Sequence, residues 1–132
     1  MADLSTSTWE KDLASSEGGV SFFENMIVRM LLIAACLPIF LSLALLVYFI
    51  HPSETPIVLH YNVYFGVDLL GIWWQVYILP LLAALFFLGH FFLARRFYVG
   101  AERIACYLML LSSGMLSLGI LIASFSVAVI NY

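Results

Sequence analysis

Charged side chains are scarce in this sequence, where Asp, Glu, Lys and Arg together make up 10% of the 132 residues. The five Lys and Arg residues form no basic cluster of the kind that binds a phosphate backbone, so we expect no nucleic-acid partner. Hydrophobic residues make up 64% of the chain, more than soluble globular proteins carry. In water such a chain would expose large apolar patches. The composition therefore predicts an integral membrane protein, with the lipid bilayer as its main partner.

Cysteine is rare as well, and acidic residues are missing from the middle of every long apolar run. Cys36 and Cys106 each lie inside such a run, which predicts two small buried side chains and neither a disulfide nor a metal pair. Ionisable groups at the centre of a membrane helix mark ion pathways and proton relays. Their absence from the apolar runs argues against transport by this chain alone.

Three long apolar runs predict an all-α membrane protein with three transmembrane helices, since about 20 apolar residues cross about 30 Å of hydrocarbon. The expected segments are a cytoplasmic N-terminal tail (1–20), helix 1 (21–50), an ordered extracytoplasmic loop (51–72), helix 2 (73–94), a cytoplasmic joint (95–103) and helix 3 (104–132). So short a joint predicts that helices 2 and 3 are antiparallel neighbours.

Local signals refine these segments. Ser21-Phe22-Phe23-Glu24 matches a capping box at the start of helix 1, and Pro38 and Pro80 predict kinks in helices 1 and 2. In the tail, Ser7 to Glu10 matches another capping box and is compatible with a short helix, but a disordered cytoplasmic tail is the favoured interpretation.

The basic residues predict the orientation of the chain. Lys11 and Arg29 flank helix 1 on its N-terminal side, and the joint 95–103 holds three arginines, whereas the loop 51–72 has neither Lys nor Arg. Cytoplasmic segments carry the excess of positive charge. We therefore expect the N-terminus and the joint in the cytoplasm, and the loop and the C-terminus on the extracytoplasmic side.

The loop holds the most sharply featured polar segment, Pro56 to Asp68. Val58 to Phe65 is rich in strand formers, which predicts a short extended or hairpin-like piece, and Asn62 and Gly66 suit turn positions, with positive φ at Gly66. The expected contact or structural residues are His60, Tyr61, Asn62, Tyr64, Phe65, Gly66 and Asp68. Aromatic residues prefer the membrane interface, and those that open helix 2 are Trp73, Trp74 and Tyr77.

Three interpretations of the loop compete. His51, Glu54, His60 and Asp68 are suitable zinc ligands, but no two have a tight ligand spacing, so we predict no metal. A His-Asp pair can transfer protons, but no nucleophile, phosphate loop or metalloprotease pattern accompanies it, so we predict no catalytic residue and no cofactor. The third interpretation is a loop that caps helices 1 and 2, and it is compatible with a contact surface for a ligand or partner.

Helix 3 is rich in small residues at four-residue spacing, which lets helix backbones approach closely. The predicted packing residues are Ser113, Ser117, Gly119, Ala123, Ser124 and Ala128. Packing within the bundle is the favoured interpretation, and an oligomer interface is the alternative. Because three helices enclose little interior, we also hypothesise a homo-oligomer or a subunit of a larger membrane complex.

Leu59 to Asp68 resembles the LHYNxYFGxD signature of small bacterial membrane proteins of uncharacterised function. The loop is also similar to the Pro-x-His-Phe/Trp-Asn-x-x-Gly-x-x-Asp loop of SdpI-type membrane proteins. The matching positions are Pro56, His60, Asn62, Gly66 and Asp68, although their spacing differs and the additional spans of SdpI-type proteins are missing. The resemblance implies a multi-pass protein of the bacterial inner membrane, with a role in toxin immunity or envelope signalling.

The sequence thus predicts a non-enzymatic membrane protein that serves as an accessory or interaction subunit, with other membrane-protein subunits or its own copies as partners. The alternative is an SdpI-like immunity or envelope-sensing protein that binds a ligand through His60 to Asp68.

Overall fold

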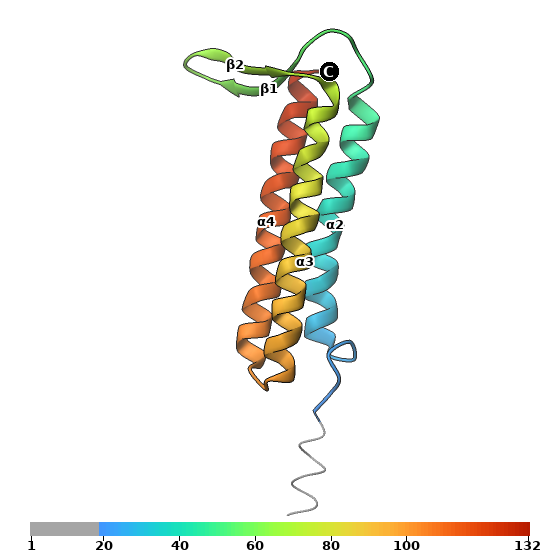
Figure 1. Ribbon diagram of the computed structural model, residues 1–132, viewed down its shortest axis with the longest axis vertical. Helices are drawn as coiled ribbons and strands as arrows, with labels where there is room; N and C mark the ends of the chain where they lie inside the picture. Colours follow the sequence, from blue (N-terminus) through green and yellow to red (C-terminus); the bar gives the residue numbers. More distant parts are fainter. Residues whose placement is uncertain (1–18) are drawn as a thin grey trace, which may run out of the picture.

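The structure, a computed structural model, describes residues 19–132, so the tail segment Ser7 to Glu10, with its two interpretations, lies outside the described residues. Three long helices lie side by side, and a β-hairpin sits at one end of the bundle (Figure 1). In chain order the elements are α2 (Met26–Phe49), β1 (Ile57–Asn62), β2 (Gly66–Gly71), the 3-10 helix η1 (Trp73–Tyr77), α3 (Ile78–Val99) and α4 (Arg103–Ile130).

All three helices are long and apolar enough to cross a membrane, with η1 and α3 together forming the second span. The shortest of the three spans, α2, has 24 residues. At about 1.5 Å per residue its length is about 36 Å, which exceeds the hydrocarbon thickness of about 30 Å. The prediction of a three-span helical membrane protein with an ordered loop between helices 1 and 2 is confirmed, and a two-stranded sheet forms much of that loop.

The predicted joint between helices 2 and 3 is longer than the observed one. The helix α3 continues through Arg95 and Arg96 to Val99, so only residues 100–102 separate it from α4. A basic side chain in the last turn of a helix interacts favourably with the helix dipole, which favours continuation through Arg96. The chain then reverses at Ala101, whose φ is 63°. The two helices pack against each other as antiparallel neighbours, as predicted.

Asn25, rather than the predicted capping box, caps α2. Its side-chain Oδ1 accepts hydrogen bonds from the backbone N–H of Ile27 (2.9 Å) and Val28 (3.4 Å). Its Nδ2 donates to the hydroxyl of Tyr107 on α4 at 2.8 Å and to that of Tyr98 on α3 at 3.3 Å. One amide therefore both starts α2 and joins it to the other two helices.

The Ser21–Glu24 segment forms a turn just before this cap. The Glu24 carboxylate accepts a hydrogen bond from the Ser21 N–H at 3.3 Å, and the Glu24 N–H donates to the Ser21 carbonyl at 3.0 Å. The capping-box prediction was wrong about which residue caps the helix, because Asn25 lies closer to its first turn.

The prolines differ in position. Pro38 lies buried inside α2, which continues on both sides of it. Pro80 occupies the first turn of α3, where a backbone N–H has no partner within the helix. Pro80 therefore marks the start of α3 rather than a bend in its middle.

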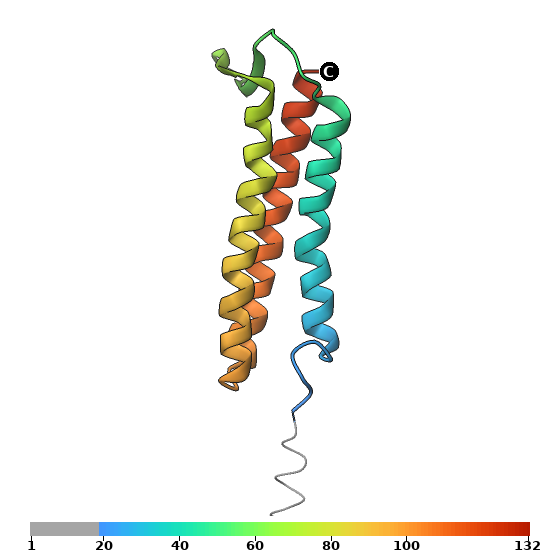
Figure 2. The same cartoon turned by 45° about the vertical axis from the view of Figure 1, so that its right-hand side comes forward.

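The helix α4 lies between the other two, and α2 and α3 contact each other little (Figure 2). A seam of small side chains makes this close approach possible. Ser124 shares a hydrogen bond with Ser42 of α2 at 2.6 Å, and the Ser117 hydroxyl donates to the Ser113 carbonyl at 2.9 Å. The backbone of α2 at Ala34 and Ala35 runs past Gly114.

The predicted packing residues divide into two groups. Ser113, Ser117, Ser124 and Ala128 are buried within the bundle. Gly119 is exposed and Ala123 is half-buried, and nothing lies within 4 Å of a Cβ added at Gly119. The interpretation as packing within the chain thus fits the first group, and an oligomer contact at Gly119 stays a prediction.

Replacing Gly114 by leucine should destabilise the bundle. The larger side chain meets the α2 backbone, with a Cβ at 3.9 Å from Ala34 and Ala35, and overpacking of this kind costs about 1–3 kcal/mol. We expect Gly114→Leu to lower the midpoint of thermal unfolding in detergent, measured by circular dichroism. Gly119→Leu is the matched control and should leave the midpoint unchanged; an equal loss in both variants would contradict the assignment of the seam.

Candidate functional site

The strands β1 and β2 form an antiparallel hairpin. Of the stretch Val58 to Phe65, expected to be extended or hairpin-like, residues 58–62 lie in β1 and residues 63–65 form the tip between the strands. Its register pairs Ile57 with Gly71, Val58 with Leu70, His60 with Leu69, Tyr61 with Val67 and Asn62 with Gly66. The register shifts on both sides of His60, so Leu59 and Asp68 have no paired residue opposite. Such bulges redirect side chains locally.

The shifted register brings His60 and Asp68 together. The Nδ1 of His60 lies 2.7 Å from Oδ1 of Asp68, and the two side chains are 62% and 42% exposed. An exposed ion pair contributes little to stability, about 0–1 kcal/mol. The pair is therefore a surface feature of the hairpin rather than the contact that holds it in place.

The hairpin turn is built by Asn62 and Gly66. The Asn62 Oδ1 accepts a hydrogen bond from the Tyr64 N–H at 2.9 Å, a turn that Asn favours, and Gly66 has the positive φ expected for it, 79°. This turn directs the tip residues outward: Val63, Tyr64 and Phe65 are 83%, 90% and 85% exposed.

Asn131, directly after α4, fixes the base of the hairpin. Its side-chain Oδ1 accepts from the Val58 N–H at 2.8 Å, and its Nδ2 donates to the Val58 carbonyl at 2.7 Å and to the Val127 carbonyl at 2.8 Å. The amide thus pairs with β1 as a neighbouring strand would. Sequence reasoning missed this residue; the one signal was a lone amide directly after the last apolar run.

Two further contacts fix the other side of the base. A Cβ at Gly71 would overlap the side chains of Leu59 and Gln75, so only glycine fits there without rearrangement. The Gln75 Oε1 accepts from the Ile72 N–H at 2.9 Å, and the Tyr77 hydroxyl donates to the Ile50 carbonyl at 3.3 Å. Beneath these contacts lies an apolar cluster of Leu46, Ile50, Ile57, Val76 and Val127.

The base therefore joins the ends of all three helices, whereas the sequence suggested a cap over helices 1 and 2 alone. The predicted interfacial aromatics lie at this level. Trp73 packs on the cluster with its ring centroid 6.3 Å from that of Tyr77, and Trp74 is half exposed.

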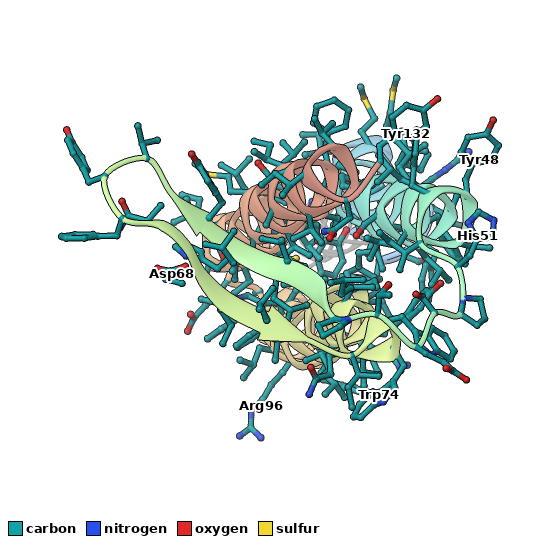
Figure 3. All side chains as sticks on the ribbon, turned by 90° about the horizontal axis from the view of Figure 1, so that it is seen from above. Tyr48, His51, Asp68, Trp74, Arg96 and Tyr132 are labelled. Carbon is teal, nitrogen blue, oxygen red and sulfur yellow. The ribbon has the colours of Figure 1, made fainter. Side chains whose placement is uncertain are left out.

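Seen from above, the hairpin runs out past the helices, and Asp68 lies away from Tyr48, His51 and Tyr132 on the other side (Figure 3). No protein-family model, curated protein or solved structure matches this chain.

Within residues 19–132, no three His, Cys, Asp or Glu side chains gather closely enough to hold a metal ion. Of the four loop residues considered as zinc ligands, all within the described part of the chain, His60 and Asp68 are the two that contact each other.

Replacing Asn131 by alanine should loosen the hairpin without unfolding the bundle. The substitution leaves the N–H and carbonyl of Val58 without their partner, which costs about 1 kcal/mol or more. We expect faster amide hydrogen exchange across β1 in detergent micelles, measured by mass spectrometry, and unchanged exchange in the helix interiors. Ser53→Ala removes an exposed hydrogen bond to Thr55 and serves as the control, with no expected change in β1.

Replacing Gly66 by valine should disorder the hairpin tip. A φ of 79° costs a side-chain-bearing residue about 1–2 kcal/mol, whereas Asn tolerates this conformation. We expect faster exchange of residues 61–67 in Gly66→Val and near-native exchange in Gly66→Asn, by the same measurement. Equal exchange in the two variants would show that the tip does not depend on this backbone conformation.

Proposed function

We propose that this small integral membrane protein is a non-enzymatic interaction subunit, which contacts a neighbouring membrane protein through the stem of its hairpin, residues 57–62 and 66–71. One observation carries the proposal: the hairpin is fixed at its base by Asn131 and yet projects sideways from the bundle (Figure 1). The part of the hairpin that extends beyond the bundle does not cover the helix ends, so capping alone does not account for it.

The exposed stem carries suitable contact chemistry. Tyr61, Val67 and Leu69 are each about half exposed beside the His60–Asp68 pair. Aromatic and apolar side chains bordered by polar groups are typical of protein interfaces. Because the base is already fixed, less ordering entropy is lost on binding, which favours affinity.

The exposure of the His60–Asp68 pair supports a role without catalysis. A pair that transfers protons to a bound substrate works best in a cleft from which water is excluded, whereas His60 is 62% exposed and Asp68 42% exposed. The pair is better suited to hydrogen bonding with a partner.

We further propose that the protein lies in a cell inner membrane, and the arginines support an extracytoplasmic position for the hairpin. Arg29 lies near the start of α2, Arg95 and Arg96 near the end of α3, and Arg103 at the start of α4. These ends all lie opposite the hairpin (Figure 1). Positive charge at one end of a bundle favours the cytoplasmic side for that end, which leaves the hairpin outside.

Co-purification in mild detergent tests the proposed role. We expect the wild-type chain to retain a membrane-protein partner in fixed stoichiometry, measured by quantitative mass spectrometry. His60→Ala combined with Tyr61→Ser removes two exposed stem side chains and should reduce the retained partner.

The matched control is His51→Ala combined with Tyr48→Ser, which changes the same residue types on the other side of the bundle (Figure 3) and should retain the partner. A wild-type chain purified alone would contradict the proposal and favour the envelope-sensing alternative. Equal retention by both double variants would remove the stem from the contact.

A further inference from the structure

We infer that the hairpin tip, Val63 to Phe65, rests in the headgroup layer of the bilayer that surrounds the bundle. The hairpin then acts as a lateral membrane anchor, in addition to the proposed partner contact of its stem. The inference rests on the depth at which the hairpin leaves the bundle, the direction it takes and the chemistry of its tip.

The hairpin leaves the bundle at the depth where the apolar spans end. The first and third spans end at Phe49 and Ile130, and the second begins at Trp73. The strand β2 ends at Gly71, two residues before Trp73, and β1 is bonded to Asn131, one residue after Ile130. Trp and Tyr near a span end favour the headgroup level, and Trp73, Trp74 and Tyr77 supply them here.

The hairpin then runs roughly across the helix axes, as the side view and the view from above agree (Figures 1 and 3). From the anchored Val58, the four steps to Asn62 span about 13 Å at about 3.3 Å per residue. That length is about the full diameter of a helix with its side chains, about 10–12 Å. The tip, which begins one residue further on, therefore lies over the surrounding lipid and not over its own bundle.

The chemistry of the tip fits the headgroup layer. Val63, Tyr64 and Phe65 are between 83% and 90% exposed, and residues 61–67 include no charged side chain. The phenol ring of Tyr64 suits the interface, where the ring meets apolar chains and the hydroxyl meets water. The apolar Val63 and Phe65 suit the boundary between headgroups and acyl chains. The nearest ionisable side chains, His60 and Asp68, contact each other.

A partner protein or a second copy of the chain would also cover the tip. The bilayer is the occupant that the structure favours, because the three spans require lipid at the depth where the tip lies. Lipid at the tip and protein at the stem are compatible, since they use different residues of the hairpin.

The test places an environment-sensitive fluorophore at the tip of the full chain. Tyr64→Cys, in a Cys36→Ala, Cys106→Ala background, is labelled with a nitrobenzoxadiazole group and reconstituted without other proteins. The nanodiscs contain phosphatidylcholine and a minor share of phosphatidylglycerol, with a nitroxide either on the headgroup or midway along the acyl chain. Thr55→Cys in the same background is the control, since it lies in the same connection outside the hairpin.

We expect the label at position 64 to emit at shorter wavelength than the label at position 55. The headgroup nitroxide should quench it more strongly than the mid-chain nitroxide does. If Tyr64→Cys does not give folded protein, the label is placed at Val63→Cys, for which the same result is expected.

Long-wavelength emission without quenching would place the tip in water and overturn the inference. Short-wavelength emission without quenching by either nitroxide would place the tip against protein, here a second copy, and would equally overturn it. Neither result bears on partner retention by the stem, so failure of this inference is distinguishable from failure of the proposed function.

Discussion

The amide of Asn131 is the interaction on which the arrangement of the hairpin depends. It satisfies both backbone groups of Val58 and, through the same Nδ2, the carbonyl of Val127 in the last turn of α4. An isolated two-stranded hairpin is marginally stable in water. Near Val58, β1 has β2 on one side and the Asn131 side chain on the other. Asn131 directly follows α4, the longest helix, so these hydrogen bonds hold the hairpin to the end of that helix.

A second amide joins separate elements at the other end of the bundle. Asn25 caps α2 and bonds to tyrosines of α3 and α4. In lipid the hydrophobic effect does not drive helices together, so close packing and interhelical hydrogen bonds determine which helices associate. Small residues on α4 provide the packing along the middle, and Asn25 joins the three helices at one end, whereas Asn131 joins the hairpin to α4 at the other.

The sequence predicted the features that depend on composition and on neighbouring residues, and missed those that depend on distant ones. Long apolar runs predicted the three spans, and Asn62 and Gly66 predicted the turn, because lipid thickness and positive φ are local requirements. The pairing of Asn131 with Val58 joins residues 73 apart, and the contact of Asn25 with Tyr107 joins residues 82 apart. A single sequence contains no signal for such pairs. The end of α3 was misplaced because arginines resemble a connection yet also suit the last turn of a helix.

The position of the hairpin explains why its exposed aromatic tip is compatible with a stable membrane protein. On a soluble protein, three adjacent apolar side chains exposed at the end of a hairpin would promote aggregation. At the level of Trp73 and Asn131 the same side chains meet an interface that accommodates them. The hydrogen bonds between Asn131 and Val58 then help to keep the tip in the headgroup layer, because a loosely held hairpin could move the tip out of it. For the proposed function, holding the tip at one depth also fixes the height and direction at which Tyr61 and the His60–Asp68 pair would face a partner in the membrane plane.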